Sequence, residues 1–372
     1  MKLLPISSLL YLCLIFITSC SPAPMKSQKT ETDESKAAAF QKYPDALYPI
    51  RKKDKWGYMN RRGDLIIPFQ YDAAEDFIDG IAKAGLIEGS NSLYGFIDRN
   101  GQWLIRPSYQ RAGIFSEGLC AVQKDDMYGF INSSGEVIIP FQFEDAGNFH
   151  EGLAAVKING WTGFINQTGN VEIEPKYICS VSHPVFVGGM APVFGADEKT
   201  GYINKEGEWV IDNKFHSASS FKDGIAWAMM EEQDDHAEHG FTIKGGYIDT
   251  TGNYIIHPEY DFGWDFSEGY ATVWKRSDDK TEKIWKVIDT QGRVILDHLP
   301  YRNVGSMSNG LIPIQNEKMD WGFMNIKGEV IIQPQFAGIN HFKNGLARME
   351  TGNAFDPEPV YINETGMIVW QE

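Results

Sequence analysis

Aromatic side chains recur at the starts of short predicted strands and have the chemistry to bind sugars. An aromatic plane stacks on the apolar face of a sugar ring. A row of such planes therefore predicts a glycan-binding surface, while the competing interpretation is that the rings fill the seams between repeated units. The candidate binding residues are Trp56, Tyr94, Tyr128, Trp161, Trp285 and Trp321.

A second set of reactive side chains consists of acids that directly precede a glycine. They are Asp79, Glu117, Glu151, Asp223 and Glu268. General acid–base catalysis needs two carboxyl groups in different environments. An acid repeated at one turn position does not meet that need, so we interpret these residues as turn-capping groups.

The polar segment 234–239 (Asp-Asp-His-Ala-Glu-His) combines histidines with acids at a spacing that could hold a divalent metal. It lies in an insertion, and we favour a solvated loop there. The sequence has no Gly-x-Ser-x-Gly elbow, no phosphate-binding glycine loop and no Cys-x-x-Cys pair. We therefore predict no catalytic residue, no metal and no cofactor, and expect a protein that is not an enzyme.

The elements that position these side chains belong to one repeated pattern. It consists of Asn or Asp, two residues of any type, and then Gly. Its copies are Asn60–Gly63, Asp98–Gly101, Asn132–Gly135, Asn166–Gly169, Asn204–Gly207, Asp249–Gly252, Asp289–Gly292, Asn325–Gly328 and Asn363–Gly366. A period between 20 and 50 residues is typical of a solenoid, a propeller or an array.

Each copy reads as a β-hairpin. The Asx side chain closes a type I turn and the glycine takes the left-handed conformation. A short strand such as Gly57–Met59 precedes the turn, and a β-branched strand such as Leu65–Ile67 follows it. A second mark, Phe-x-acid-Gly as in Phe77–Gly80, leads into another strand. We predict three or four strands per unit and no helix.

The fold class is therefore all-β, with about nine hairpin or meander units over residues 45–372. One unit cannot bury its apolar faces, but stacked neighbours can. The chain starts late in one unit and stops early in another, which would suit a closed ring. Nine units exceed the usual 4–8 propeller blades. We therefore predict a curved open solenoid, with a closed propeller-like ring as the alternative.

The units resemble the WG (KWG) repeat of bacterial proteins. The Trp-Gly pair stands at Trp56-Gly57 and Trp321-Gly322, and Tyr-Gly replaces it at Tyr94-Gly95 and Tyr128-Gly129. Thr162, Thr200 and Gly245 depart from the pattern, and Lys286 replaces a strand glycine. The resemblance implies secreted or surface-linked binding modules that are not enzymes, with a weak similarity to cell-wall-binding hairpin repeats.

The N-terminal sequence predicts where the protein is located in the cell. Residues 1–19 have the pattern of a signal peptide, with Lys2 before a nine-residue apolar run. The sequence Ile17-Thr18-Ser19-Cys20 resembles the lipobox of bacterial lipoproteins, which implies lipidation of Cys20. Acyl chains on Cys20 would then hold the protein in the bilayer, and Ser21 favours the outer membrane. Residues 20–44 are interpreted as the lipidated cysteine and a flexible tether.

Composition narrows the function. With 34 basic and 50 acidic residues the net charge is −16, which argues against nucleic-acid binding. Four cysteines exclude a disulfide-built scaffold, and a bond between Cys120 and Cys179 is left open.

We expect a non-catalytic scaffold, lipid-anchored in the bacterial cell envelope, that binds an envelope protein or a cell-wall glycan. One alternative is an envelope hydrolase with its site in degenerate repeats, near Val181–Met190 or Ser306–Gly310. The other is a purely structural assembly protein.

Overall fold

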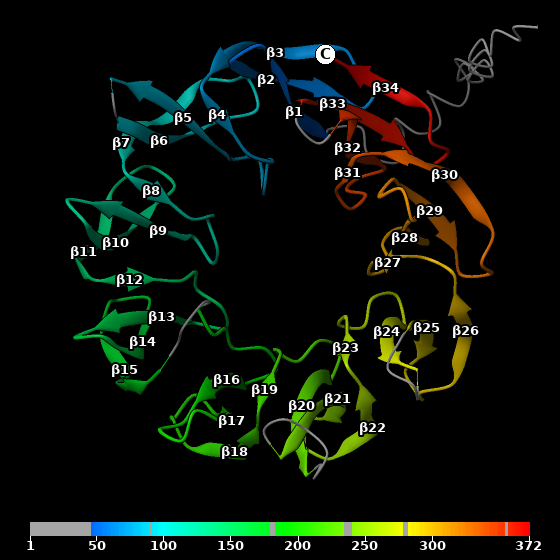
Figure 1. Ribbon diagram of the computed structural model, residues 1–372. Helices are drawn as coiled ribbons and strands as arrows, with labels where there is room; N and C mark the ends of the chain where they lie inside the picture. Colours follow the sequence, from blue (N-terminus) through cyan, green and yellow to red (C-terminus); the bar gives the residue numbers. More distant parts are fainter. Residues whose placement is uncertain (1–45, 90, 179–182, 234–239, 278–281, 354–355) are drawn as a thin grey trace, which may run out of the picture.

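The computed structural model describes residues 46–89, 91–178, 183–233, 240–277, 282–353 and 356–372 of the chain. The described residues form nine antiparallel sheets arranged as the blades of a closed ring (Figure 1). The all-β repeat was predicted correctly, but the preferred open solenoid was wrong and the alternative ring is the fold. The described residues contain no helix long and apolar enough to cross a membrane.

Within a blade the chain runs from the central channel outward to the rim, and forms in turn an inner, a second, a third and an outer strand. The inner strands are β4 (Ala73–Ala74), β8 (Arg111–Ala112), β12 (Asp145–Ala146), β19 (Ser217–Ala218), β23 (Phe262–Gly263), β27 (Asn303–Val304) and β31 (Gly338–Ile339). The second strands are β1 (Leu47–Lys52), β5 (Ala82–Glu88), β9 (Leu119–Lys124), β13 (Leu153–Ile158), β16 (Ala191–Phe194), β20 (Ile225–Gln233), β24 (Tyr270–Arg276), β28 (Leu311–Gln315) and β32 (Leu346–Asn353).

The third strands are β2 (Lys55–Asn60), β6 (Asn91–Ile97), β10 (Met127–Asn132), β14 (Trp161–Asn166), β17 (Thr200–Ile203), β21 (Phe241–Asp249), β25 (Lys283–Asp289), β29 (Trp321–Asn325) and β33 (Asp356–Asn363). The outer strands are β3 (Leu65–Tyr71), β7 (Trp103–Tyr109), β11 (Val137–Phe143), β15 (Val171–Tyr177), β18 (Trp209–Phe215), β22 (Tyr254–Tyr260), β26 (Val294–Leu299), β30 (Val330–Phe336) and β34 (Ile368–Gln371). We number the blades 1 to 9 from β1–β3 to β31–β34.

The Asx turn joins the third strand to the outer strand in every blade. In blade 1, Asn60 Oδ1 accepts hydrogen bonds from the backbone N–H groups of Arg62 and Asp64, at 2.8 and 3.0 Å. The same two bonds recur at the other eight Asx residues. All nine turn glycines have positive φ, as the sequence predicted.

The outer strand bulges where it passes the strand glycine. Between the pairs Trp56↔Tyr71 and Tyr58↔Ile67, β3 advances two residues more than β2. A Cβ on Gly57 would lie 2.5 Å from the Ile67 carbonyl oxygen, so only glycine fits under the bulge. In blade 7 the outer strand advances one residue less, between Trp285↔Leu299 and Val287↔Leu296. The smaller bulge coincides with the replacement of the glycine by Lys286.

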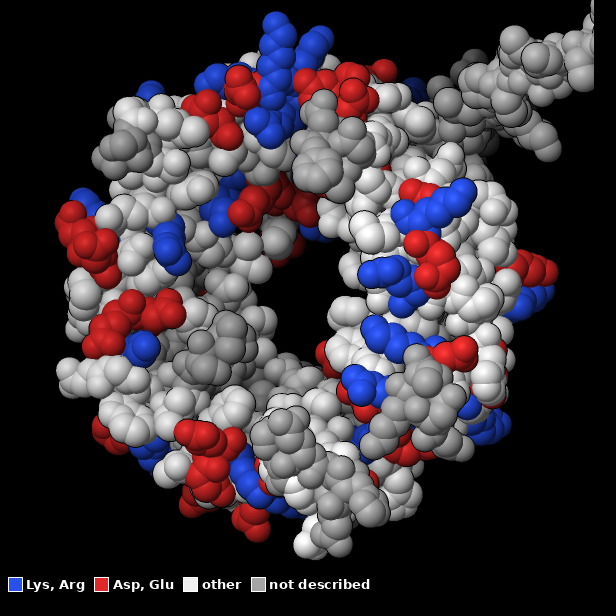
Figure 2. All heavy atoms as spheres, in the orientation of Figure 1, with Lys and Arg blue, Asp and Glu red and all other residues white. Residues whose placement is uncertain are grey.

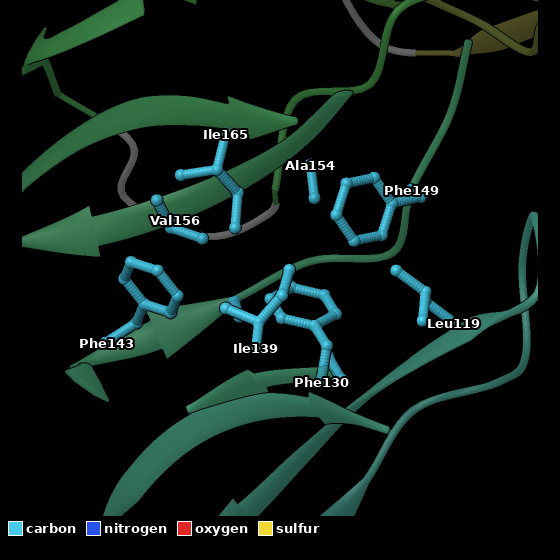
Figure 3. Close-up of a cluster of buried hydrophobic side chains, with 10 residues drawn as sticks. Leu119, Phe130, Ile139, Phe143, Phe149, Ala154, Val156 and Ile165 are labelled. Atoms are coloured by element: carbon cyan, nitrogen blue, oxygen red, sulfur yellow. The ribbon is translucent and has the colours of Figure 1, made fainter. Parts of the chain in front are cut away.

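Each seam between blades is an apolar cluster. Figure 3 shows the seam between blades 3 and 4, where Phe130, Ile139 and Phe143 of one blade meet Phe149, Val156 and Ile165 of the next. The aromatic ring of a third strand contacts the Phe of the following loop in seven seams; five of these loops have the Phe-x-acid-Gly sequence, and those of Phe186 and Phe342 have Gly or Asn in place of the acid. The pairs, with ring centroids 4.6 to 5.0 Å apart, are Tyr58–Phe77, Phe96–Phe115, Phe130–Phe149, Phe164–Phe186, Tyr202–Phe221, Tyr247–Phe266 and Phe323–Phe342.

Small side chains near the channel and large ones near the rim make the seams wedge-shaped. Ala82, Ala154 and Ala226 are buried on second strands, while Tyr71 and Phe143 are buried on outer strands. A tapered core of this kind turns each blade relative to its neighbour. The turns add up to a closed circle, which the blade count alone did not reveal.

The ring closes through side chains of blades 9 and 1. Tyr48 and Met59 pack with Leu346 and Tyr361. The Tyr361 hydroxyl donates to the Pro49 carbonyl oxygen at 2.7 Å, and the Tyr48 hydroxyl donates to the Asn344 carbonyl oxygen at 2.6 Å. Strand β34 pairs with β33, and β1 pairs with β2, so neither blade borrows one of these strands from the other.

The turn glycines allow a test of seam packing. A Cβ on Gly101 (φ +75°) would lie 2.6 Å from Ile67 Cγ2 in the neighbouring blade, whereas a Cβ on Gly80 (φ +83°) would have no atom within 4 Å. Gly80→Ala should cost about 1 kcal/mol for its left-handed backbone. Gly101→Ala should cost about 3 kcal/mol, because overpacking adds to that strain. Urea unfolding of both variants measures the difference, and equal losses would contradict the seam argument.

Candidate binding surface

The predicted aromatic row is distributed over six blades and is not assembled into one site. Five of the residues occupy equivalent positions, each opposite the last residue of its outer strand, as in Trp56↔Tyr71 and Trp321↔Phe336. The others in this position are Tyr94, Tyr128 and Trp285. Trp161 is one residue out of phase, because its neighbour Thr162 takes the equivalent pairing with Tyr177.

Exposure separates these aromatic residues. Trp285 is 3% exposed and its indole N–H donates to the Arg302 carbonyl oxygen, so it fills a seam. Trp56, Tyr128 and Trp321 are partly buried against seam clusters. Trp161 is 46% exposed at the tip of a hairpin. A sugar has access to a broad aromatic face at Trp161 and has none at Trp285, and glycan binding by the set stays a prediction.

The acids before glycine occupy left-handed positions of tight two-residue hairpins. Asp79 and Gly80 have φ values of 48° and 83°, and Ile78 and Ile81 exchange both backbone hydrogen bonds. This geometry is a type I′ turn, which favours Asp-Gly and Asn-Gly. Sequence reasoning identified the turn position but expected each acid to cap its own turn.

Three of the glutamates instead join neighbouring blades. Glu151 accepts hydrogen bonds from the backbone N–H groups of Gly188 and Gly189 in the next loop, at 2.6 and 2.9 Å. Glu117 accepts from Gly152 N–H, and Glu268 accepts from the N–H groups of Asn309 and Gly310. Glu117, Glu151 and Glu268 are therefore structural bridges between neighbouring blades, whereas the described residues show no such bridge at Asp79 or Asp223.

The degenerate repeats take part in the same bridges. Gly188, Gly189, Asn309 and Gly310 belong to the loops in which a hydrolase site was considered, and their N–H groups are bonded to Glu151 and Glu268. Residues 181–182 of the first loop lie outside the described residues. The potential metal-binding segment 234–239 also lies outside them. The described part of the chain holds no cluster of three or more metal-ligating side chains.

Cys120 is buried on β9 in the place of an alanine, and its thiol is free. Burial raises the pKa of this thiol to about 12, so it is protonated and unreactive at neutral pH. Cys179 lies outside the described residues.

A pocket breaks the repeat at the seam where the ring closes. It has a volume of about 630 Å³ and lies between blades 9 and 1, with residues of blade 2 at its edge. Aromatic and aliphatic side chains supply part of its lining, and charged side chains supply the rest. The lining includes Tyr48, Trp56, Glu75, Asp76, Lys343 and Arg348.

Charges around this pocket are paired across the seam. Lys343 Nζ of blade 9 lies 2.8 Å from Asp76 Oδ2 of blade 2. The guanidinium of Arg348 lies over the Trp56 ring, 5.2 Å from its centroid, in a cation–π arrangement. Burial is the main cause that raises the pKa of the Tyr361 hydroxyl, so this group donates its hydrogen bond throughout the physiological range.

Sequence reasoning missed this pocket, although one residue signalled it. Tyr48 pairs with Met59 as Ala82 pairs with Ile97 and Ala154 with Ile165. Seven of the other blades have alanine or cysteine at this position and blade 8 has Ile312, so a bulky tyrosine here marks an irregular seam. The central channel is the other opening in the ring, and Figure 2 shows it passing through the molecule with charged side chains of both signs around its mouth.

The geometry defines a nine-bladed β-propeller built from a hairpin repeat. The WG containing repeat family matches residues 56–84, 94–128, 128–160, 163–177, 201–232, 246–275 and 321–353. These segments cover more than half of the chain, and the protein belongs to this family. No curated protein matches it.

Solved structures with a related shape are distant in sequence. The β-propeller domain of the Trilobed protease from Pyrococcus furiosus is 10% identical with a TM-score of 0.44, over 81% of this chain and 98% of that one. BamB from Moraxella catarrhalis is 11% identical with a TM-score of 0.42, over 82% and 97%. The computationally designed Ika8 protein is 15% identical with a TM-score of 0.42, over 77% and 95%.

The Glu151 bridge makes stability depend on pH. Burial raises the pKa of this carboxyl, but hydrogen bonds from Gly189, Lys205 and Gly188 outweigh burial and hold it below its ordinary value of 4.5. Stability from the bridge is therefore present above pH 4.5 and is lost as the pH falls through the lower folded-state value. Glu151→Gln should cost about 1 kcal/mol at pH 7, allowing for solvent screening.

Urea unfolding at pH 7 and pH 3 checks this expectation. The difference between the wild type and Glu151→Gln should shrink at pH 3. Asp223→Asn is the control, because it changes the same turn position where the described residues show no bridge. A pH-independent loss in Glu151→Gln would contradict the bridge.

Proposed function

We propose that this protein is a non-catalytic scaffold, lipid-anchored in the bacterial cell envelope and held at the outer membrane, that binds a cell-wall glycan or an envelope protein. One observation carries the proposal: three of the five repeated acids and most of the repeated aromatic rings are used to join blades. The ring then offers a large surface with an open channel, and its repeated groups do not converge on a catalytic centre.

The shifted carboxyl groups support a non-catalytic role. Burial alone would raise the pKa of each of these carboxyl groups, but hydrogen bonds outweigh it, with help from a neighbouring cation at all of them except Asp249. The groups with a lowered pKa are Asp72, Glu151, Asp249, Glu259, Asp289 and Asp297. A general acid that works at neutral pH needs the opposite shift. These six groups are ionised acceptors suited to holding loops.

Surface aromatic residues favour a glycan among the two partner classes. Trp161 is 46% exposed and keeps a face on which a sugar ring could stack. If it contributes to binding, Trp161→Ala should lower the affinity of the full chain for soluble peptidoglycan fragments about tenfold, the effect of losing about 1.4 kcal/mol. Trp209→Ala removes a 38% exposed tryptophan outside the predicted set and serves as the matched control.

Calorimetric titration of the detergent-solubilised chain with these fragments measures the effect, and affinity capture from envelope extract tests the protein partner. Unchanged glycan binding in Trp161→Ala would remove this residue from the site. Failure of the wild type to bind the fragments or to capture an envelope protein at micromolar concentration would overturn the proposed function.

The proposed anchor has a separate test. Cys20→Ala removes the thiol that would carry lipid, so the protein should move from the membrane fraction to the soluble fraction. Stable anchoring needs more than one acyl chain, so the shift should be nearly complete. Immunoblots of the two fractions measure it, with Cys13→Ala as the control. Unchanged membrane retention of Cys20→Ala would contradict lipidation.

A further inference from the structure

Blades 1 and 5 differ from the other seven on the side of the channel, and blade 5 keeps a single bridge there, Ile178↔Phe194. In seven blades a two-residue inner strand pairs with the second strand, as Ala73 and Ala74 pair with Gly85 and Ala84. In blade 1 the described residues give the sheet β1-β2-β3, with no inner strand along β1. The pocket at the closing seam lies at this edge, because Tyr48 and Pro49 of β1 line it.

The position of an inner strand is fixed by a constant count along the chain. In blade 2 the inner-strand residue Ala73 precedes Ala82 of the second strand by nine residues. The residue of blade 1 that is equivalent to Ala82 is Tyr48. The same count of nine separates Asp145 from Ala154 in blade 4, and it recurs in blades 3, 6, 7, 8 and 9. Nine residues before Tyr48 is Ala39.

The loop that follows the inner strand obeys a second count. The aromatic residue of this loop precedes the reference residue of the second strand by five residues, as Phe77 precedes Ala82. Five residues before Tyr48 is Tyr43, and Asp45 then falls where Asp79 stands in blade 2. Pro44 and Ala46 differ from Ile78 and Gly80, so the aromatic residue and the acid are kept while the type I′ turn sequence is not.

We propose that residues 39–45 of this chain occupy the pocket as the inner strand and loop of blade 1. The segment runs antiparallel to β1, with Ala39 opposite Arg51 and Phe40 opposite Ile50, the counterparts of the pairs Ala73↔Gly85 and Ala74↔Ala84. The described chain begins at Ala46, immediately before β1, so no long connection is needed.

Backbone hydrogen bonding gives the segment a defined role. In blade 2, Asp72 N–H donates to the Gly85 carbonyl oxygen at 2.9 Å, and Glu75 N–H donates to the Lys83 carbonyl oxygen at 3.0 Å. The corresponding acceptors in blade 1 are the carbonyl oxygens of Arg51 and Pro49. The Pro49 carbonyl already accepts the Tyr361 hydroxyl, but a carbonyl oxygen has two lone pairs and can accept both bonds.

The pocket lining suits this occupant. Phe342, Leu346 and Tyr361 form an apolar wall from blade 9, and Phe40 and Tyr43 would bury apolar surface against it. An exposed sheet edge is a template for pairing with another chain, and cover by the protein's own segment prevents that. The segment also fixes the ring end of the proposed tether at the closing seam, which leaves residues 20–38 as the tether.

Disulfide trapping tests the register in the full chain. Opposed residues of an antiparallel pair have Cα atoms about 4.5 to 5.5 Å apart, which suits a disulfide bond. Under mild oxidation the double variant Ala39→Cys, Arg51→Cys should form an intramolecular disulfide about tenfold faster than the control Thr32→Cys, Arg51→Cys. The control also carries two new cysteines, but residue 32 is not opposite residue 51 in the proposed register. Peptide mapping by mass spectrometry identifies the bond and its rate.

A second measurement covers the case in which the cysteine pair disturbs folding. Tyr43→Ala should lower the thermal midpoint by several degrees, because a buried aromatic residue is lost, while Thr32→Ala should leave it unchanged. Faster trapping of the Ala39 pair, or the selective loss with Tyr43→Ala, supports the proposal. Equal trapping rates together with equal midpoints would overturn it and leave the β1 edge for a peptide from another protein.

Discussion

The ring depends on the contact between an outer strand and the turn glycine of the next blade. Cβ atoms added to Gly101, Gly169 and Gly252 would lie 2.6 to 2.9 Å from the branched carbons of Ile67, Ile139 and Ile211. At seven of the nine turns the isoleucine equivalent to Ile67 is the nearest neighbour of a Cβ added to the turn glycine. At the eighth turn Leu296 occupies this position against Gly328. At the closing seam the Val369 carbonyl oxygen takes that place against Gly63. The glycine thus serves two purposes at once, because its turn needs a positive φ and its neighbour needs the space.

Seam packing also explains how the repeat tolerates its irregular units. In blade 7 the third strand carries Val287 instead of an aromatic residue, and the next loop carries Met307 instead of phenylalanine. Ile312 replaces the alanine of the second strand, and these three residues pack in one cluster. At the closing seam, Tyr48 takes the alanine position and lies 5.8 Å from the Tyr361 ring. Loss of volume at one position is matched by a gain at another, which keeps the core dense.

The sequence was sufficient to predict the strands, because local chemistry determines them. An Asx residue followed by glycine at a fixed interval allows few conformations, and all nine turns form as predicted. Closure was not predictable in the same way, because it depends on the angle between blades. That angle results from side-chain volumes across each seam, such as Ala154 near the channel and Phe143 near the rim. The usual range of 4–8 propeller blades carries no information about these side-chain volumes, so it could not predict whether the ring closes.

The candidate site shows the same limit more strongly. Sequence periodicity identified Trp56, Trp285 and Trp321 as equivalent, yet it could not say that Trp285 is buried or that Arg348 of another blade covers Trp56. It also treated the glutamates as local caps, because a bridge from Glu151 to Gly188 joins residues 37 positions apart. Repetition is evidence of what every blade needs, namely turns, bulges and seams. A function particular to this protein is therefore better sought where the repetition fails, and the closing seam is the place in the described ring where a deviating residue, a pocket and an uncovered strand edge coincide.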